Sequence, residues 1–173
     1  MVIKEKSFEK YLDNESIQSR VKALAEQINN DYKDTKPLFI AVLNGSFMFA
    51  ADLMKEVTIP CEISFVKVAS YEEMESTGNV KQLIGLNENI FKRDVIIVED
   101  IIDTGKTITK ILSEFESLGT NSVEVLTLLR KPLSLEIPLK YVGFEIEDDF
   151  VLGYGLDYDG LGRNLKDLYK LEG

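Results

Sequence analysis

The chain has 173 residues, of which 45% are hydrophobic, and this size suits a single domain that buries a sizeable core. Thirty acidic residues against twenty basic ones give a formal net charge of -10, which disfavours binding to nucleic acid or anionic membranes, and no apolar stretch is long enough to span a bilayer. Histidine is absent, which excludes His-based triads and metal–histidine clusters, so acid–base chemistry falls to carboxylates, lysine or tyrosine.

The first predicted element is an amphipathic helix over residues 15–33. Apolar side chains recur there at helical spacing, and Asp13 and Asn14 stand just upstream as capping candidates. The apolar stripe consists of Ile17, Val21, Leu24, Ala25 and Ile28.

A strand–loop–helix unit follows this helix. Residues 37–43 (PLFIAVL) form a short continuous apolar run, which predicts a buried strand. Asn44 and Gly45 lie in the loop, and residues 46–57 can form a helix.

The same plan then repeats. Residues 61–71 predict a strand that begins with Cys61, the single cysteine, which cannot form an internal disulfide and is expected to pack as a small apolar side chain. Residues 72–82 are polar and predict a surface loop, whereas residues 95–100 (VIIVED) predict another buried strand.

A helix is predicted over residues 105–119, with Gly119 as its C-terminal cap. Its apolar face consists of Ile108, Ile111, Leu112, Phe115 and Leu118. Strand candidates follow at 122–129, 141–146 and 150–155. This alternation predicts an α/β fold with a mainly parallel sheet flanked by helices, and a ligand site beyond the carboxyl ends of the strands.

The turn after the strand at 95–100 combines acidic residues with a helix start. It is not a nucleotide-binding P-loop, because that motif needs glycine five positions before Gly105 and Asp100 stands there. The free N–H groups of a helix start, with the hydroxyls of Thr104 and Thr107, would still favour a phosphate group. Glu99 and Asp100 would repel that phosphate, so we expect them to bind ribose hydroxyls or Mg²⁺; the alternative is a solvated acidic loop.

The string VEDIIDTGKT (98–107) closely resembles the phosphoribosyl-diphosphate (PRPP) binding signature of the type I phosphoribosyltransferases. The resemblance implies one domain over residues 1–173, with a core of roughly 15–145 and a small hood from the N-terminal segment and roughly 146–173. It also implies that Asp103 faces the reacting base as the catalytic proton acceptor. The implied PRPP set is Glu99, Asp100, Asp103, Thr104, Gly105, Lys106 and Thr107, with Glu99 and Asp100 as Mg²⁺ ligands.

The later part of the chain resembles one branch of that family. LLRKP (128–132), VGFEIEDDFVLGYGLDY (142–158) and Arg163 are similar, in order and spacing, to the hypoxanthine-guanine phosphoribosyltransferases. The resemblance implies that Lys131 donates to the purine 6-oxo group, Phe150 stacks on the ring and the Val151 backbone bonds the base edge. Asp157 completes the implied purine set and would approach a second Mg²⁺. The implied pyrophosphate set is Asn44, Gly45, Ser70, Tyr71 and Arg163.

Two departures from relatives stand out. Asn44 replaces a lysine found in some of them, so a positive charge near the pyrophosphate is lost, although the backbone N–H can still bind. Relatives often carry a cis peptide bond here, and we expect one between Leu43 and Asn44. The pair Asp148–Asp149 replaces a lysine beside the aromatic residue.

The sequence therefore predicts a cytoplasmic, Mg²⁺-dependent enzyme of purine salvage that joins PRPP to hypoxanthine or guanine, giving IMP or GMP and pyrophosphate. Two alternatives remain: a regulatory protein that uses the same fold to bind a nucleotide, and a transferase that prefers xanthine. The expected partners are small molecules, without nucleic acid or membrane, and the resemblance implies a homodimer or homotetramer.

Overall fold

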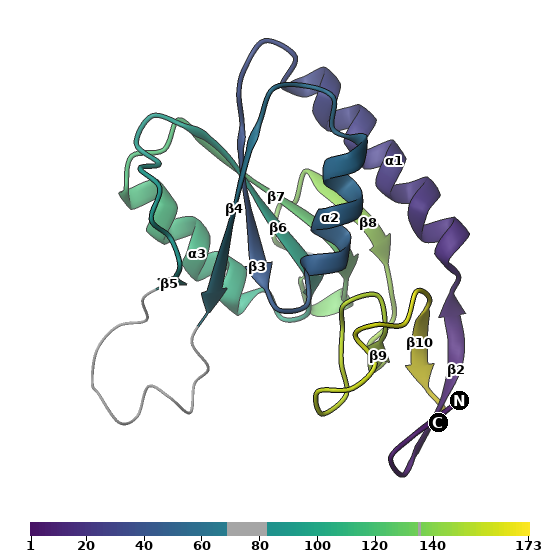
Figure 1. The fold of residues 1–173 in the computed structure, drawn as a ribbon. Coiled ribbons are helices and arrows are strands. Elements are labelled where there is room, and N and C mark those ends of the chain that lie inside the picture. The colour runs from purple at the N-terminus through teal and green to yellow at the C-terminus, as the bar shows by residue number, and fades with distance from the viewer. Residues whose placement is uncertain (69–82, 135) are drawn as a thin grey trace, which may run out of the picture.

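The structure is a computed structural model that describes residues 1–68, 83–134 and 136–173 (Figure 1). Its centre is a six-stranded sheet with the order β5-β4-β3-β6-β7-β8. All neighbouring strands are parallel except β5, which pairs antiparallel with β4. The strands are β3 (Leu38–Leu43), β4 (Glu62–Val68), β5 (Leu83–Ile84), β6 (Asp94–Ile102), β7 (Ser122–Arg130) and β8 (Tyr141–Glu145).

The central strands are apolar on both sides because both faces of the sheet are covered. Successive side chains of a strand point to opposite faces. In β3, Phe39 and Ala41 belong to one buried cluster, whereas Leu38 and Ile40 belong to a second. A continuous apolar run is thus the expected sequence for such a strand.

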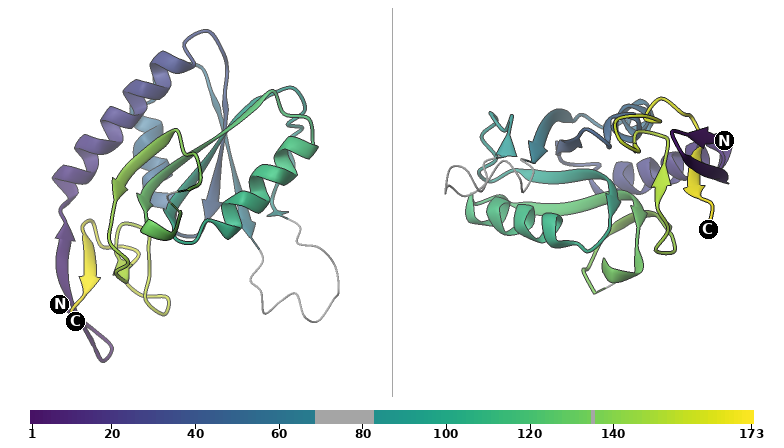
Figure 2. Two further views of the ribbon diagram at one scale, coloured as in Figure 1. Left: turned by 180° about the vertical axis from the view of Figure 1, so that it is seen from behind. Right: turned by 90° about the horizontal axis from the view of Figure 1, so that it is seen from below.

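The helices cover the two faces separately (Figure 2). Helices α1 (Asn14–Asp31) and α2 (Phe47–Glu56) pack on one face, and α3 (Lys106–Ser117) packs on the other. The cap predicted for α1 is present, since the Asp13 carboxylate accepts a hydrogen bond from the Ser16 N–H at 2.8 Å. No described helix is long and apolar enough to cross a membrane.

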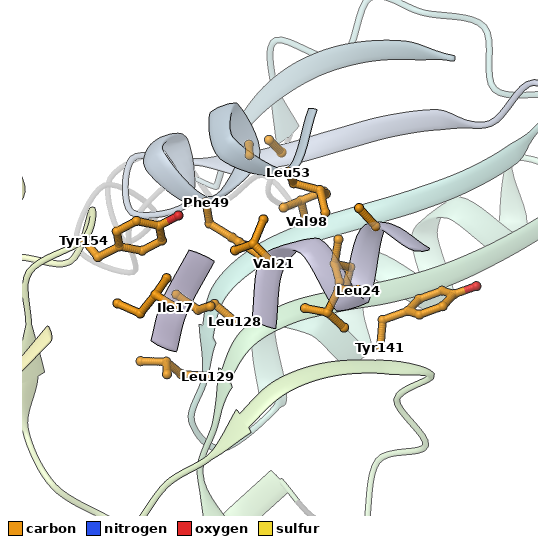
Figure 3. Packing of buried hydrophobic residues seen from close by; sticks show 14 of the residues in the cluster. Ile17, Val21, Leu24, Phe49, Leu53, Val98, Leu128, Leu129, Tyr141 and Tyr154 are labelled. Carbon is orange, nitrogen blue, oxygen red and sulfur yellow. The ribbon is translucent and has the colours of Figure 1, made fainter. Parts of the chain in front are cut away.

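The larger cluster joins α1 and α2 to the sheet (Figure 3). Tyr154 is fully buried there, and its hydroxyl donates a hydrogen bond to Asp52 of α2 at 2.7 Å. Gln18 of α1 also donates to Asp52, at 2.7 Å. This network ties the segment that carries Tyr154 to both helices.

A second, antiparallel sheet of order β1-β2-β10-β9 lies beside the carboxyl ends of the main sheet (Figure 1). Its strands are β1 (Val2–Ile3), β2 (Lys6–Leu12), β9 (Val151–Leu152) and β10 (Leu168–Leu171). We call this sheet, together with residues 146–167, the hood. It joins an N-terminal segment to a C-terminal one, because β2 pairs with β10.

The predicted α/β architecture is confirmed, with corrections at three places. The strand expected over 150–155 is limited to Val151–Leu152 and belongs to the hood. Leu118 was expected on the buried face of α3 but is 47% exposed, because the helix ends at Ser117 and Leu118 is its C-cap. The strand expected over 61–71 is observed as Glu62–Val68, and residues 69–71 lie outside the described residues.

Candidate active site

A hollow of about 280 Å³ lies where the carboxyl ends of β6 and β7 face the hood. This volume is near the lower end of the range for small-molecule sites, ~300 Å³ and above. Its lining consists of Asp100, Ile101, Asp103, Lys131, Phe150, Val151, Leu156 and Asp157. The fold thus brings together six of the residues named from the sequence, whereas Ile101 and Leu156 were not named.

The acidic pair Glu99 and Asp100, near the end of β6, receives few hydrogen bonds and little positive charge from the described part of the protein. Glu99 is buried, and burial together with the neighbouring Asp100 charge raises the pKa of its carboxyl well above the usual value. Burial also raises the pKa of Asp100, although hydrogen bonding to the Ile101 N–H at 2.9 Å and the Arg163 charge oppose this. In the part of the chain that the structure describes, no donor is hydrogen bonded to the Glu99 carboxylate. The pair is therefore suited to an external cation or donor.

Gly45 sets the position of one of these carboxylates. A Cβ atom added at Gly45 would lie 1.5 Å from Oδ2 of Asp100, so only glycine fits the loop against that side chain. Gly155 of the hood is equally close to the same loop, since its Cβ would lie 2.0 Å from the Gly45 carbonyl oxygen. The loop after β3 is thus packed between Asp100 and the hood.

The donor chemistry of the site fits Mg²⁺. Carboxylate oxygens are its preferred protein ligands, and Mg²⁺ is commonly held by one or two carboxylates together with substrate phosphates. Among the described residues no group of three or more Asp, Glu or Cys side chains forms a ready-made metal cluster. Of the predicted ligands, Asp100 and Asp157 line the hollow, whereas Glu99 is buried and does not line it.

The predicted phosphate loop opens helix α3. Gly105 is the N-cap with φ +77°, a conformation that glycine adopts without strain, and the helix begins at Lys106. Asp103, Thr104, Lys106 and Thr107 are exposed beside it. The start of this helix therefore has exposed hydroxyl side chains beside first-turn N–H groups that lack intrahelical partners, although the Lys106 N–H donates to the Thr104 hydroxyl at 3.4 Å. Such a helix start can bind phosphate.

Lys131 lies between two carboxylates at the edge of the hollow. Its Nζ is 3.1 Å from Oδ1 of Asp148 and 3.9 Å from Oδ1 of Asp103, and only 12% of its side chain is exposed. The ammonium has three donors, so it can bind a further acceptor in the hollow while it keeps these contacts. The contact with Asp148 was not foreseen, because no local pattern relates two residues in separate segments.

Phe150 is supported from behind by the hood. Its ring is 6.4 Å from the buried ring of Phe8 in β2 and 5.8 Å from Tyr158, at an edge-on angle of 84°. Tyr158 is held in turn by a hydrogen bond from its hydroxyl to Glu5 at 2.9 Å. Phe150 remains 45% exposed, so part of its ring is available for a ligand. The sequence reasoning missed the supporting rings.

Asp157 and Arg163 are paired with each other. Arg163 Nη2 lies 2.5 Å from Oδ1 of Asp157, and its Nη1 donates to the Gly155 carbonyl at 2.8 Å. The other Asp157 oxygen accepts from the Gly160 N–H at 2.7 Å. Both side chains are partly exposed beside the acidic pair, and a ligand that uses them has to compete with this ion pair.

Of the remaining residues predicted to bind pyrophosphate, the structure describes Asn44 but not Ser70 and Tyr71. The Leu43–Asn44 peptide bond is cis, as expected, and Asn44 is exposed at the end of β3. Ser70 and Tyr71 lie outside the described residues, so their predicted place is left open.

Comparison with known proteins gives the same family from sequence and from structure. Residues 7–159 match the model of the phosphoribosyl transferase domain. A hypoxanthine-guanine phosphoribosyltransferase of Staphylococcus epidermidis is 45% identical over 157 residues, covering 89% of this chain and 88% of the relative. A crystal structure of a hypoxanthine-guanine phosphoribosyltransferase from Bacillus anthracis superposes with a TM-score of 0.86 at 36% identity, covering 97% of this chain and 100% of that one. A hypoxanthine phosphoribosyltransferase from Staphylococcus aureus gives 0.86 at 42% identity, with 95% and 91% coverage.

Proposed function

The chain belongs to the phosphoribosyltransferase family, and from that membership we infer that it transfers the phosphoribosyl group of PRPP to hypoxanthine or guanine in purine salvage. A purine ring nitrogen forms a bond to C1 of the ribose while the bond from C1 to pyrophosphate breaks. The electron pair of the broken bond leaves with pyrophosphate, and the products are IMP or GMP. The observation that supports this activity most is the hollow that contains Asp100, Asp103, Lys131 and Phe150 at one edge of the sheet.

The roles of the side chains are those that the resemblance to the hypoxanthine-guanine phosphoribosyltransferases implies, and their chemistry fits these roles. Asp103 accepts the proton that the purine loses, and its negative charge favours the positive charge that develops on the ribose. Lys131 donates to the purine 6-oxo group, Phe150 stacks on the ring, and the Val151 backbone bonds the base edge. Asp157 lies at the same edge of the hollow.

PRPP occupies the rest of the edge in this proposal. The N–H groups and hydroxyls of residues 104–107 hold its 5-phosphate, and Glu99 and Asp100 accept from the ribose hydroxyls. Arg163, together with Asn44, Gly45, Ser70 and Tyr71, binds the pyrophosphate.

Mg²⁺ is the proposed cofactor: Glu99 and Asp100 would hold it directly or through its water shell, and Asp157 would approach a second Mg²⁺ at the pyrophosphate. When bound, it neutralises charge on the diphosphate so that an acidic site can bind an anionic substrate. The acidic pair with raised pKa values supports this assignment, because a cation would stabilise both carboxylates in their charged form.

The proposal extends to organisation and assembly. The whole chain acts as one domain, in which the core of roughly residues 15–145 binds PRPP and the hood supplies part of the purine pocket. We expect a cytoplasmic protein that forms dimers or tetramers. Light scattering of the purified protein tests the assembly.

An activity assay tests the function directly. Purified protein is incubated with PRPP and Mg²⁺ and with hypoxanthine, guanine, xanthine, adenine or uracil in turn, and nucleotide and pyrophosphate are quantified. We expect equal amounts of IMP or GMP and pyrophosphate from hypoxanthine and guanine, and loss of turnover in excess EDTA that added Mg²⁺ restores. Absence of product from both 6-oxopurines would refute the proposed function, and full activity in EDTA would refute the metal.

A further inference from the structure

A buried arginine directly precedes Lys131 in the chain but does not line the hollow. Arg130 is the last residue of β7, immediately before Lys131, and it is 8% exposed. A buried charge is costly unless hydrogen bonds compensate it. None of the roles proposed above uses this side chain.

The bonds of Arg130 go mainly to the backbone of one turn. Its Nη2 donates to the carbonyl oxygens of Ser134 and Ile137, both at 2.8 Å. Its Nη1 is 4.0 Å from a carboxylate oxygen of Glu145, whose side chain is largely exposed, so that ion pair is weak. Its Nε has no hydrogen-bond partner among the described residues. The guanidinium thus joins the carbonyls of Ser134 and Ile137, and we refer to the described residues 131–134 and 136–137 as the turn.

That turn is the wall against which the phosphate loop lies. A Cβ atom added at Gly105 would be 1.8 Å from Cδ1 of Ile137 and 3.7 Å from Cβ of Ser134. The turn is also joined to the strand end before Asp103, because the Lys131 N–H donates to the Ile102 carbonyl at 2.9 Å. A shift of the turn therefore reaches Gly105, the N-cap of α3.

We propose that Arg130 is a positioning residue for PRPP: by fixing the carbonyls of Ser134 and Ile137, it fixes the side chain of Ile137 against Gly105 and so places the 5-phosphate loop. The inference rests on the proposed function, since it assigns the 5-phosphate to residues 104–107. Its effect should fall on PRPP more than on the purine.

The test compares two arginines that make the same kind of contact. Arg130→Lys keeps the charge but replaces the planar fork by a single ammonium, which does not bridge the two carbonyls in the same geometry. Arg20→Lys is the matched control, because Arg20 bridges the carbonyls of Gly143 (2.8 Å) and Val142 (2.6 Å) and does not line the hollow. Ile137→Ala is a second variant: it removes the side-chain atoms that lie against Gly105 and leaves the guanidinium intact.

The readouts are KM for PRPP, KM for hypoxanthine, kcat, the melting temperature and the Kd of ribose 5-phosphate from calorimetry. A loop shift below 1 Å should cost less than the ~10²-fold penalty of a 1 Å misplacement. We therefore expect about a tenfold rise in KM for PRPP and in the Kd of ribose 5-phosphate for Arg130→Lys, and a rise in the same direction for Ile137→Ala. KM for hypoxanthine should change less than about twofold in these two variants. Arg20→Lys should lower the melting temperature without raising KM for PRPP more than KM for hypoxanthine.

The outcomes separate this inference from the proposed function. If Arg130→Lys changes KM for PRPP and KM for hypoxanthine equally, the positioning role is overturned. It is also overturned if Arg20→Lys raises KM for PRPP selectively in the same way. If Arg130→Lys does not fold, an unchanged KM for PRPP in Ile137→Ala overturns it. If the unmodified protein binds ribose 5-phosphate but turns over no purine, the proposed function fails and the Kd values alone decide the role of Arg130.

Discussion

Replacing Gly45 by alanine should damage the site through a single contact. The new Cβ would lie 1.5 Å from Oδ2 of Asp100, whereas ordinary contact begins at 3.4 Å, so the carboxylate has to move by about 2 Å. Gly45 is not among the glycines with positive φ, so backbone strain adds nothing to this effect. Because a 1 Å misplacement can cost ~10²-fold, we expect kcat/KM for PRPP to fall by about 10²-fold or more.

The assay measures kcat/KM for PRPP, the Mg²⁺ concentration that gives half-maximal rate, and the melting temperature. The Mg²⁺ requirement should rise, since Asp100 is a proposed ligand. Gly119→Ala is the control: its Cβ would lie 2.8 Å from the Phe91 ring at a φ of +75°, and neither residue lines the hollow, so it should lower stability and leave the kinetics unchanged. If Gly45→Ala keeps its kcat/KM within about twofold and its Mg²⁺ requirement, Asp100 is not needed where the structure places it.

Other predictions concern the proton, the choice of base and acid stability. Asp103→Asn should lower kcat by roughly 10²-fold with a smaller change in KM for PRPP, and an unchanged kcat in steady-state assays would leave Asp103 as a turn residue only. Lys131→Met removes the donors for a 6-oxo group, so the ratio of kcat/KM between hypoxanthine and adenine should narrow; the same ratio in both proteins would contradict the pairing. Burial alone would raise the pKa of Asp52, but hydrogen bonds from Lys55, Tyr154 and Gln18 lower it below the ordinary 3.8. Its stabilising effect is therefore present above about pH 3.8 and lost as the pH falls through the lower folded-state pKa, so the melting temperatures of the unmodified protein and Asp52→Asn should converge in acid. A constant difference between pH 6 and about pH 2 would contradict this.

The main sheet could be predicted because burial on both faces leaves a local signal. Residues 95–98 are all apolar, and β6 is buried from Val95 to Glu99. The helices were predictable for a similar reason, since their apolar residues recur at helical spacing. The acidic residues at the end of β6 could then be assigned to a ligand edge from topology alone.

The hood left no comparable signal. Strand β2 is mostly exposed, with Phe8 as its buried residue, and its partner β10 begins at Leu168. Such pairing depends on contacts between distant segments, which no window of sequence contains. The link between Lys131 and Asp148 escaped prediction for the same reason, as did the support of Phe150 by Phe8. The assignment of base contacts came from family resemblance and not from periodicity.

The pairing of β2 with β10 has a consequence for synthesis on the ribosome. The strands of the main sheet and the phosphate loop are complete once residue 145 has emerged, but β2, which pairs with β1 early, finds its second neighbour β10 only after residues 168–171 have followed. Until then β9 (Val151–Leu152), which directly follows Phe150, has no strand to join, because among the described strands it pairs only with β10. A nascent chain could therefore fold the part that carries the phosphate loop early, while the hood side of the purine pocket has to wait until residues 168–171 have been made.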